Sequence, residues 1–391
     1  MPGAQPSKDV KKGSKLFRFR KNSQLDSLES QDSKVTAVPA TFTLSRKHIS
    51  NLDVISSTPT LASGSRPSYR LEDIPDDLLH EIASWCTPPT LLRASLACKR
   101  LLTLFHPYLH HTIDCSYTDL CRSAIKIFPH SPSTTRYIKN LILKPNREPS
   151  GWANSSEKSI NEGDVLDVLE GIASNGDLPL LSMFKWFGKE RPRDSFWLSL
   201  RENCPYLRDI GTSVGQKTLA SFRADLELFK FQNLQGFHLF TQVSEHWTMT
   251  DYPINQDLPA TLWNMLFSSD SLEELTLDGT CFAADAWNLK PVFSGRWPSL
   301  RKLALGNVWI DDTDSISDDE MMCMFFQAHP TLEEVSSLGT MFYSSEVMGC
   351  LLSMPKLGLY RGRLQQLQHA NSVLSRIQSL DLSVRLVQPL C

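Results

Sequence analysis

The sequence predicts an α/β repeat protein in which a small three-helix unit precedes an irregular series of strand–helix repeats. Three observations support this fold class. Of the 391 residues, 41% are apolar and 21% are charged, so the chain can bury a core. Apolar residues recur at helical spacing over 71–112, and a Leu-based strand pattern recurs over 136–391.

Residues 1–68 are predicted to form a disordered, basic, Ser/Thr-rich tail. They hold 11 Lys/Arg against 5 Asp/Glu, and 18 of the 68 are Ser or Thr. Only 20 are apolar, too few to offset the entropy lost on ordering. The basic residues at 8–21 could act in nuclear import or bind an anionic surface; a solvated tail is the simpler interpretation.

Composition also limits the function classes. No apolar run reaches the ~18 residues of a membrane span, and the start lacks a signal-peptide pattern. The nine Cys residues contain no C-x-x-C pair, which argues against a disulfide framework or a structural zinc site. We therefore expect a cytoplasmic and/or nuclear protein with no cofactor, no metal, and neither membrane nor nucleic acid as a partner.

The first structured unit is predicted to be three short helices. Pro75 and two following acids, Asp76 and Asp77, are typical of a helix start. Pro88 and Pro89 end that helix and begin the next. The three apolar sets are Leu78, Leu79, Ile82, Ala83 and Cys86, then Leu91, Leu92 and Leu96, then Leu101, Leu102, Leu104, Phe105, Tyr108 and Leu109. So small a core should need a partner.

This string resembles an F-box, a motif of the form L-P-x-E-L-L-x-x-I followed by D-L-L-x-x-S-x-V-C-K-x-W. The resemblance covers 71–112 and departs from the motif at Asp77, Thr90 and Leu101. An unrelated three-helix cap is the alternative. The resemblance implies docking on a Skp-family adaptor through Ile74, Pro75, Leu78, Leu79, Ile82, Leu91, Leu92, Leu96, Cys98 and Lys99.

The rest of the chain repeats a pattern of Pro-x-Leu-x-x-apolar. Five copies carry the Pro, beginning at residues 179, 205, 298, 330 and 355, and three more lack it. Successive copies are 20 to 38 residues apart, near the period of a leucine-rich repeat, whose L-x-x-L-x-L core forms one strand per turn. Helix-like stretches at 166–172, 219–231, 321–326 and 347–352 fall between the copies. An ordinary α/β domain with strand–helix alternation is the alternative.

One enzyme signature occurs at 211–215, where Gly211-Thr212-Ser213-Val214-Gly215 matches the G-x-S-x-G nucleophile elbow. No oxyanion-hole segment precedes it, and no later His, including His238, has a distinctive acid partner in the sequence. The repeat register instead puts Ser213 at an exposed strand position. We expect that the chain is not an enzyme, with a serine hydrolase as a remote alternative.

The combination resembles the F-box/leucine-rich-repeat family that is abundant in fungi. It implies the substrate-recognition subunit of an SCF-type cullin–RING ubiquitin ligase; an F-box scaffold that acts outside a ligase is the alternative. Strand alternation predicts a substrate-binding face that is aromatic near the F-box, acidic in the middle and basic at the far end. Its residues would be Lys185, Phe187, Asp209, His238, Phe240, Glu274, Asp278, Lys302 and Arg361.

Overall fold

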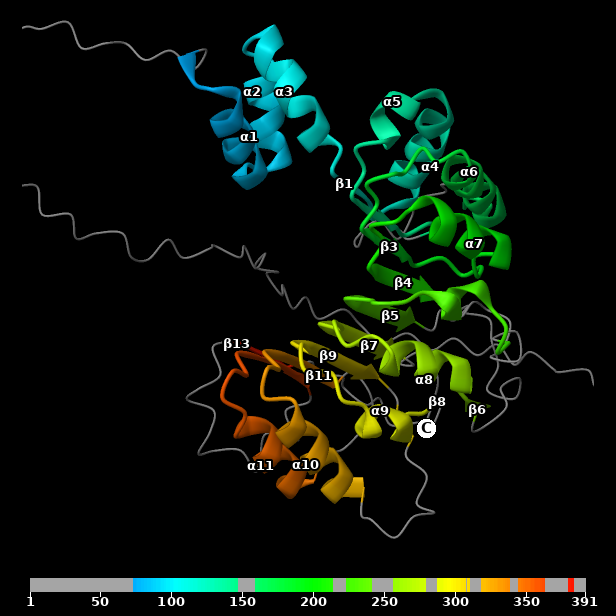
Figure 1. Ribbon diagram of the computed structural model, residues 1–391, viewed down its shortest axis with the longest axis vertical. Coiled ribbons are helices and arrows are strands. Elements are labelled where there is room, and N and C mark those ends of the chain that lie inside the picture. The colour runs from blue at the N-terminus through cyan, green and yellow to red at the C-terminus, as the bar shows by residue number, and fades with distance from the viewer. Residues whose placement is uncertain are drawn as a thin grey trace, which may run out of the picture. The chain divides into compact units, whose positions relative to one another are not determined.

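The computed structural model describes residues 73–146, 159–213, 223–240, 256–278, 287–306, 308–309, 318–337, 344–362 and 379–382. All of them belong to one compact unit, Ser68–Cys391 (Figure 1). The predicted tail at 1–68 lies outside the described residues.

The predicted three-helix unit is confirmed as α1 (Asp76–Trp85), α2 (Pro88–Ser95) and α3 (Lys99–Leu109). Pro75 directly precedes α1, and Pro88 and Pro89 open α2, as expected from their fixed φ. The Arg100 side chain donates a hydrogen bond to the carbonyl of Ile74 at 2.7 Å and also bonds Asp76, so the start of α3 is tied to the start of α1. The unit's own core is Leu79, Ala83, Leu91, Leu101 and Phe105.

The repeat region is built on one ten-stranded parallel sheet. In spatial order its strands are β1 (Thr112–Cys115), β2 (Asn140–Leu143), β3 (Met183–Trp186), β4 (Asp209–Ser213), β5 (Gly236–Phe240), β7 (Glu274–Asp278), β9 (Lys302–Gly306), β11 (Glu334–Ser337), β12 (Leu359–Gly362) and β13 (Ser379–Leu382). Spatial order follows chain order, whereas a doubly wound α/β domain reverses it. The strands therefore belong to successive repeats. The sheet begins with β1 at Thr112, before residue 136, where the repeat region was expected to start.

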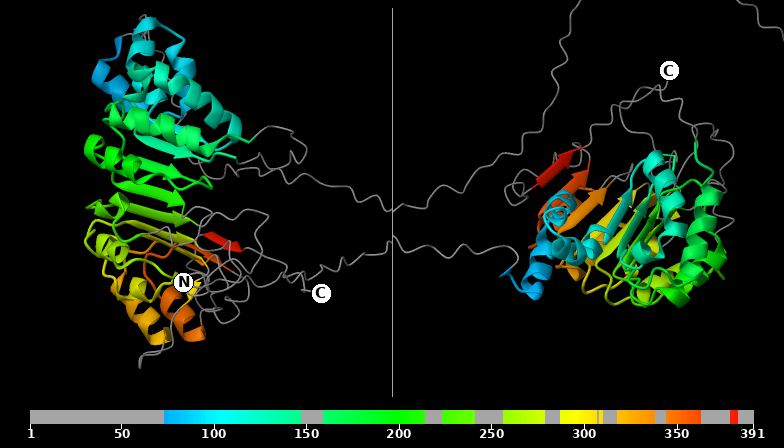
Figure 2. Two further views of the ribbon diagram at one scale, coloured as in Figure 1. Left: turned by 90° about the vertical axis from the view of Figure 1, so that its right-hand side faces the viewer. Right: turned by 90° about the horizontal axis from the view of Figure 1, so that it is seen from above.

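Helices cover one side of this sheet (Figures 1 and 2). The described helices are α4 (Thr118–Ile127), α5 (Pro132–Thr135), α6 (Glu162–Ser174), α7 (Asp194–Asn203), α8 (Ala260–Phe267), α9 (Lys290–Ser294), α10 (Asp318–Ala328) and α11 (Ser345–Leu352), with 3-10 turns η2 (Phe128–His130) and η4 (Glu227–Lys230). The predicted helices at 166–172, 321–326 and 347–352 lie within α6, α10 and α11.

The predicted helix at 219–231 is only partly present. Residues 214–222 lie outside the described part of the chain, and the rest contains just the single 3-10 turn η4. Extended backbone at Leu226 and Phe231 bounds that turn on both sides. Leu228 and Phe229 are nevertheless buried, so the turn fills the place of a repeat helix with two apolar side chains.

Strand residues alternate between the helix side and the opposite face. The Leu that opens each repeat pattern is buried, and so are the two strand residues that point toward the helices, such as Phe184 with Trp186 and Leu275 with Leu277. The alternate residues form what we call the open face of the sheet. A smaller parallel sheet of β6 (Gln256–Asp257), β8 (Trp287–Asn288) and β10 (Val308–Trp309) accompanies three of the repeats. None of the described helices combines the length and apolarity of a membrane span.

Candidate functional site

The first candidate surface lies on the three-helix unit and is unusually apolar. Leu78 and Ile82 of α1 are 56% and 45% exposed; Leu92 of α2 and Leu96, the residue that directly follows α2, are 53% and 77% exposed. Each pair is four residues apart and so shares a helix face. Pro75 and Lys99, from the same expected set, are also exposed. We call these exposed side chains the F-box face.

Two of the ten expected adaptor-binding residues do not belong to that face. Leu79 and Leu91 are 0% and 3% exposed, and both pack in the core of the three-helix unit. Their expected contact role is corrected, because helical spacing turns them away from Leu78 and Leu92, their neighbours in sequence. Ile74 and Cys98 are half-buried against the same core.

Two apolar side chains of this surface were missed by the sequence analysis. Trp85 is 82% exposed, with its Nε1 donating to Glu81 Oε1 at 2.8 Å, and Leu102 of α3 is 45% exposed. Trp85 follows Leu78 and Ile82 by seven and three residues, so the helical period alone could have placed it on their face. The F-box motif has no defined residue at position 85, so the motif alone does not indicate Trp85.

The second candidate surface is the open face of the sheet. The register aligns Met183, Asp209, Gly236, Glu274 and Lys302 in one row and Lys185, Gly211, His238, Thr276 and Ala304 in the next. Polar contacts cross the strands along these rows. Lys185 Nζ lies 3.0 Å from Asp209 Oδ2, and Lys302 Nζ lies 2.7 Å from Glu274 Oε1. A lysine therefore neutralises two of the carboxylates of the expected acidic middle, Asp209 and Glu274.

Asp209 is the most enclosed acid of this face, with 14% of its side chain exposed. Burial opposes its ionisation, but contact with the His238 imidazole and the charge of Lys185 together hold the pKa of Asp209 below its usual value. The carboxylate also needs the glycine on the next strand, since a Cβ on Gly236 would lie 2.6 Å from Asp209 Cγ. Asp209 is therefore an anion held in place by its neighbours.

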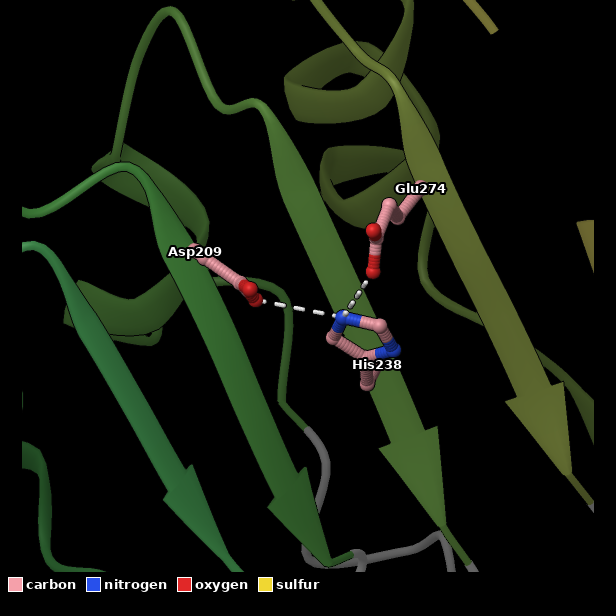
Figure 3. A group of neighbouring side chains, drawn as sticks. All are labelled: Asp209, His238 and Glu274. Atoms are coloured by element: carbon pink, nitrogen blue, oxygen red, sulfur yellow. Dashed lines mark ion pairs between the residues drawn. The ribbon is translucent and has the colours of Figure 1, made fainter. Parts of the chain in front are cut away.

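His238 lies between two acids, contrary to the expectation that it has no acid partner. Its Nε2 is 3.1 Å from Asp209 Oδ1 and 3.8 Å from Glu274 Oε2 (Figure 3). Its Nδ1 is 2.9 Å from the Thr276 hydroxyl. The three residues come from β4, β5 and β7, and their positions in the chain differ by 29 and 36. Only the register of the sheet brings them together, so no local sequence pattern could reveal the group.

An aromatic pair adjoins these polar rows. The rings of Phe187 and Phe240 have centroids 4.5 Å apart, although β4 separates their strands. Ser213 stands opposite Phe240 on that middle strand. The Lys144 ammonium lies 4.9 Å from the centre of the Phe187 ring, close enough for a cation–π contact. The predicted aromatic zone of the open face is thus a real cluster.

The remaining expected residues are spread along the face. Asp278 and Lys302 are half-buried and Arg361 is exposed. Arg361 lies on β12, opposite Ser336 of β11 and Asp381 of β13. Because β11 lies between β12 and β9, the strand of Lys302, Arg361 is separated from the central polar group.

Ser213 is not the exposed residue that the register predicted. It is 0% exposed, and its hydroxyl donates a hydrogen bond of 2.5 Å to the carbonyl of Gly188. A nucleophile elbow needs an accessible hydroxyl bonded to a base. Ser213 therefore acts as a structural link between the loop after β3 and the end of β4, and gives the hydrolase alternative no support.

Comparisons with known proteins bear on the first surface. A family model described as F-box-like matches residues 71–116. Among solved structures, the complex of Rad7 and Elc1 in yeast matches with 13% identity and a TM-score of 0.42, covering 78% of this chain and 86% of that one. The Q64V53_BACFR protein of Bacteroides fragilis matches with 12% identity and a TM-score of 0.28, covering 68% and 83%.

These two structural likenesses are too slight to inform function. The search of curated proteins finds no relative of this chain. The three-helix unit carries the family match, and the parallel sheet with its helices carries the repeat. The chain thus contains an F-box-like domain at residues 71–116, followed by a parallel strand–helix repeat region.

Proposed function

We propose that this chain is the substrate-recognition subunit of an SCF-type cullin–RING ubiquitin ligase. The F-box face would bind a Skp-family adaptor, and the open face of the sheet would bind a protein substrate. The observation that carries the proposal is the F-box face itself. Six large apolar side chains of the three-helix unit are between 45% and 82% exposed: Leu78, Ile82, Trp85, Leu92, Leu96 and Leu102.

Such a surface is costly in water and typical of a binding site. The unit's own core holds only five buried apolar residues, one fewer than the six large apolar side chains that are exposed. Exposed apolar groups that share a helix face favour a partner that buries them. A helical partner with its own apolar groove would complete this small core.

The open face suits a binding role rather than catalysis by the chain. Its central charges are paired, and its aromatic pair offers an apolar contact beside them. A subunit of this kind acts by holding a substrate near the ligase, which raises the substrate's effective concentration there. The adaptor supplies the link to the cullin.

The first test measures adaptor affinity for the full chain and for the double variant Leu92→Ala with Leu96→Ala. Because both side chains are more than half exposed, the fold should be kept, whereas binding should fall at least ~30-fold, as expected for central apolar contacts worth ~2 kcal/mol or more. The matched control is Leu120→Ala with Ile127→Ala on α4, 48% and 54% exposed. Equal affinity of the two double variants would argue against the F-box face.

A second test separates a ligase subunit from an F-box scaffold that acts elsewhere. The tagged chain is purified from cells, and a cullin is sought by mass spectrometry. The proposal expects the cullin with the wild type and its loss with Leu92→Ala and Leu96→Ala. Adaptor without cullin would favour the scaffold.

A further inference from the structure

The open face of the sheet carries three potential metal ligands that converge on one point. Asp209, His238 and Glu274 each offer one ligand atom, and these three atoms lie within 4.8 Å of one another (Figure 3). We propose that they bind a divalent transition-metal ion, with Zn²⁺ as the ion to test. This inference does not depend on the proposed ligase function.

The first support is an unpartnered, buried ring nitrogen. The side chain of His238 is 9% exposed, and its Nε2 makes no hydrogen bond to any described residue. Asp209 Oδ1, which is 3.1 Å away, likewise has no hydrogen-bond partner in the described part of the chain. Buried polar atoms are nearly always satisfied, so these two atoms, which face each other at 3.1 Å, share either a proton or a bound cation.

The second support is that neighbouring side chains contact the ligand atoms that do not face the proposed ion, and so orient the ligands. The Nδ1 atom of His238 lies 2.9 Å from the Thr276 hydroxyl, which turns Nε2 toward the acids. Lysines bind the outer oxygens of both acids, Lys185 at Asp209 Oδ2 and Lys302 at Glu274 Oε1. Each carboxylate therefore keeps its inner oxygen for the centre. Metal ligands in proteins are commonly fixed by such outer contacts.

The two separations from His238 Nε2 are close to those that a small ion needs. Zn²⁺ bound to nitrogen and oxygen at ~2.0–2.1 Å in a tetrahedral site places neighbouring ligands about 3.3 Å apart. The observed distances from His238 Nε2 are 3.1 Å to Asp209 Oδ1 and 3.8 Å to Glu274 Oε2. One imidazole with two carboxylates is a donor set that Zn²⁺ and related ions accept. The Glu274 side chain, 32% exposed, leaves a route from solvent.

The competing occupant is a proton. If Nε2 of His238 carried one, it would donate to Asp209 Oδ1 while Nδ1 accepted from the Thr276 hydroxyl, so a neutral imidazole would satisfy the same atoms. The two lysines favour the proton, since they already balance the charge of the acids. Direct measurement of metal binding by the full chain decides between the two.

The experiment titrates chelator-treated full chain with Zn²⁺ by calorimetry, and with Co²⁺ by visible absorption, which reports on coordination. We expect one ion per chain and tetrahedral Co²⁺ bands. His238→Ala should lower the affinity at least 100-fold. Glu274→Gln, at a partly exposed position and of the same shape, should lower it at least tenfold and should keep the fold.

His110→Ala is the matched control, because the rings of His106 and His110, 4.7 Å apart, form a His pair outside the proposed site that could collect Zn²⁺. It should leave the affinity unchanged. Absence of Zn²⁺ heat and Co²⁺ bands in the wild type would overturn the proposal in favour of the proton. Equal affinity of wild type and Glu274→Gln, with loss in His110→Ala, would also overturn it.

Discussion

The carboxylate of Asp209 lies in the space that a side chain on Gly236 would need. A Cβ atom at position 236 would be 2.6 Å from both Cγ and Oδ1 of Asp209. The two residues face each other in register on β4 and β5. Asp209 reaches His238, two residues after Gly236 on β5, across the position where a side chain at 236 would stand. The contact between Asp209 and His238 therefore requires a glycine at position 236.

We predict that Gly236→Ala destabilises the protein by ~1–3 kcal/mol, the usual cost of an overpacked site. The Asp209 side chain cannot easily move away from a Cβ at position 236, because it is only 14% exposed and Lys185 Nζ lies 3.0 Å from its Oδ2. Chemical denaturation of the full chain measures the change in the free energy of unfolding.

Gly349→Ala is the control for this prediction. Gly349 lies inside α11, and nothing is within 4 Å of the place where its Cβ would stand. An alanine there should raise stability by ~0.5–1 kcal/mol through helix propensity. If both substitutions had the same effect, the close approach of Asp209 to position 236 would be disproved.

The Pro-x-Leu pattern carried most of the information on the fold. It placed the Leu of each repeat correctly, since Leu181, Leu207 and Leu300 are at most 1% exposed, and the strand after each one follows. The pattern could not reveal β1, because Thr112–Cys115 contains no such Leu and is a strand only through its pairing with β2. The Pro-x-Leu pattern thus predicted the repeat region but not its first strand, β1.

The candidate sites were less predictable, for a physical reason. Strand alternation correctly put Lys185, Asp209 and His238 on one face, but contacts across strands depend on register. The pairing of Asp209 with Lys185 and of Glu274 with Lys302 balances two of the acids of the expected acidic zone, which the sequence pattern could not show. Ser213 is buried because Gly188, 25 residues earlier, comes within reach of its hydroxyl.

In the F-box-like domain we predict different effects for two neighbouring types of leucine. Leu79→Ala should destabilise the three-helix unit by ~2–5 kcal/mol, because Leu79 is fully buried in its core. Leu96→Ala should change stability by less than ~0.5 kcal/mol, because Leu96 is 77% exposed. Thermal unfolding monitored by hydrogen exchange of α1 to α3 would distinguish them.

Adaptor binding gives the complementary readout for the same two variants. Leu96→Ala should weaken binding while the three-helix unit keeps its protection from exchange. Leu79→Ala should weaken binding only as far as it unfolds that unit. Loss of protection in Leu96→Ala would mean that this leucine belongs to the core.

For the open face we predict that Phe187→Ala with Phe240→Ala removes a subset of the proteins that co-purify with the chain. The two rings contact each other at 4.5 Å and form the apolar part of this face. Aromatic contacts at the centre of an interface are commonly worth ~2 kcal/mol or more. Quantitative mass spectrometry of proteins captured under proteasome inhibition measures the change.

Phe267→Ala is the matched control, since Phe267 is a 39% exposed phenylalanine on α8, on the helix side of the sheet. It should leave the captured set intact, and adaptor binding should be normal in all variants. A captured set that survives the loss of both Phe187 and Phe240 would locate substrate binding elsewhere on the chain.

The last prediction concerns pH and the buried imidazole of His329, which is 0% exposed. Its Nε2 accepts a hydrogen bond from the Trp297 backbone N–H at 3.0 Å, and its Nδ1 lies 2.7 Å from the Phe325 carbonyl. The ring is therefore neutral, with its proton on Nδ1. Burial disfavours the charged form and lowers the pKa of His329 below 6.5, an effect that the Phe325 carbonyl only partly opposes.

Because the pKa of His329 is lower in the folded than in the unfolded chain, the unfolded state binds more protons below pH ~6.5. The stability that His329 contributes is complete above that pH and is lost as the pH falls toward its folded pKa, with a slope of at most ~1.4 kcal/mol per pH unit.

His329→Gln cannot titrate, so its free energy of unfolding should fall less steeply than that of the wild type between pH ~7.5 and ~5.5. His130→Gln, at an exposed position, should keep the wild-type slope. Parallel curves for the wild type and His329→Gln would show that His329 does not control this pH dependence.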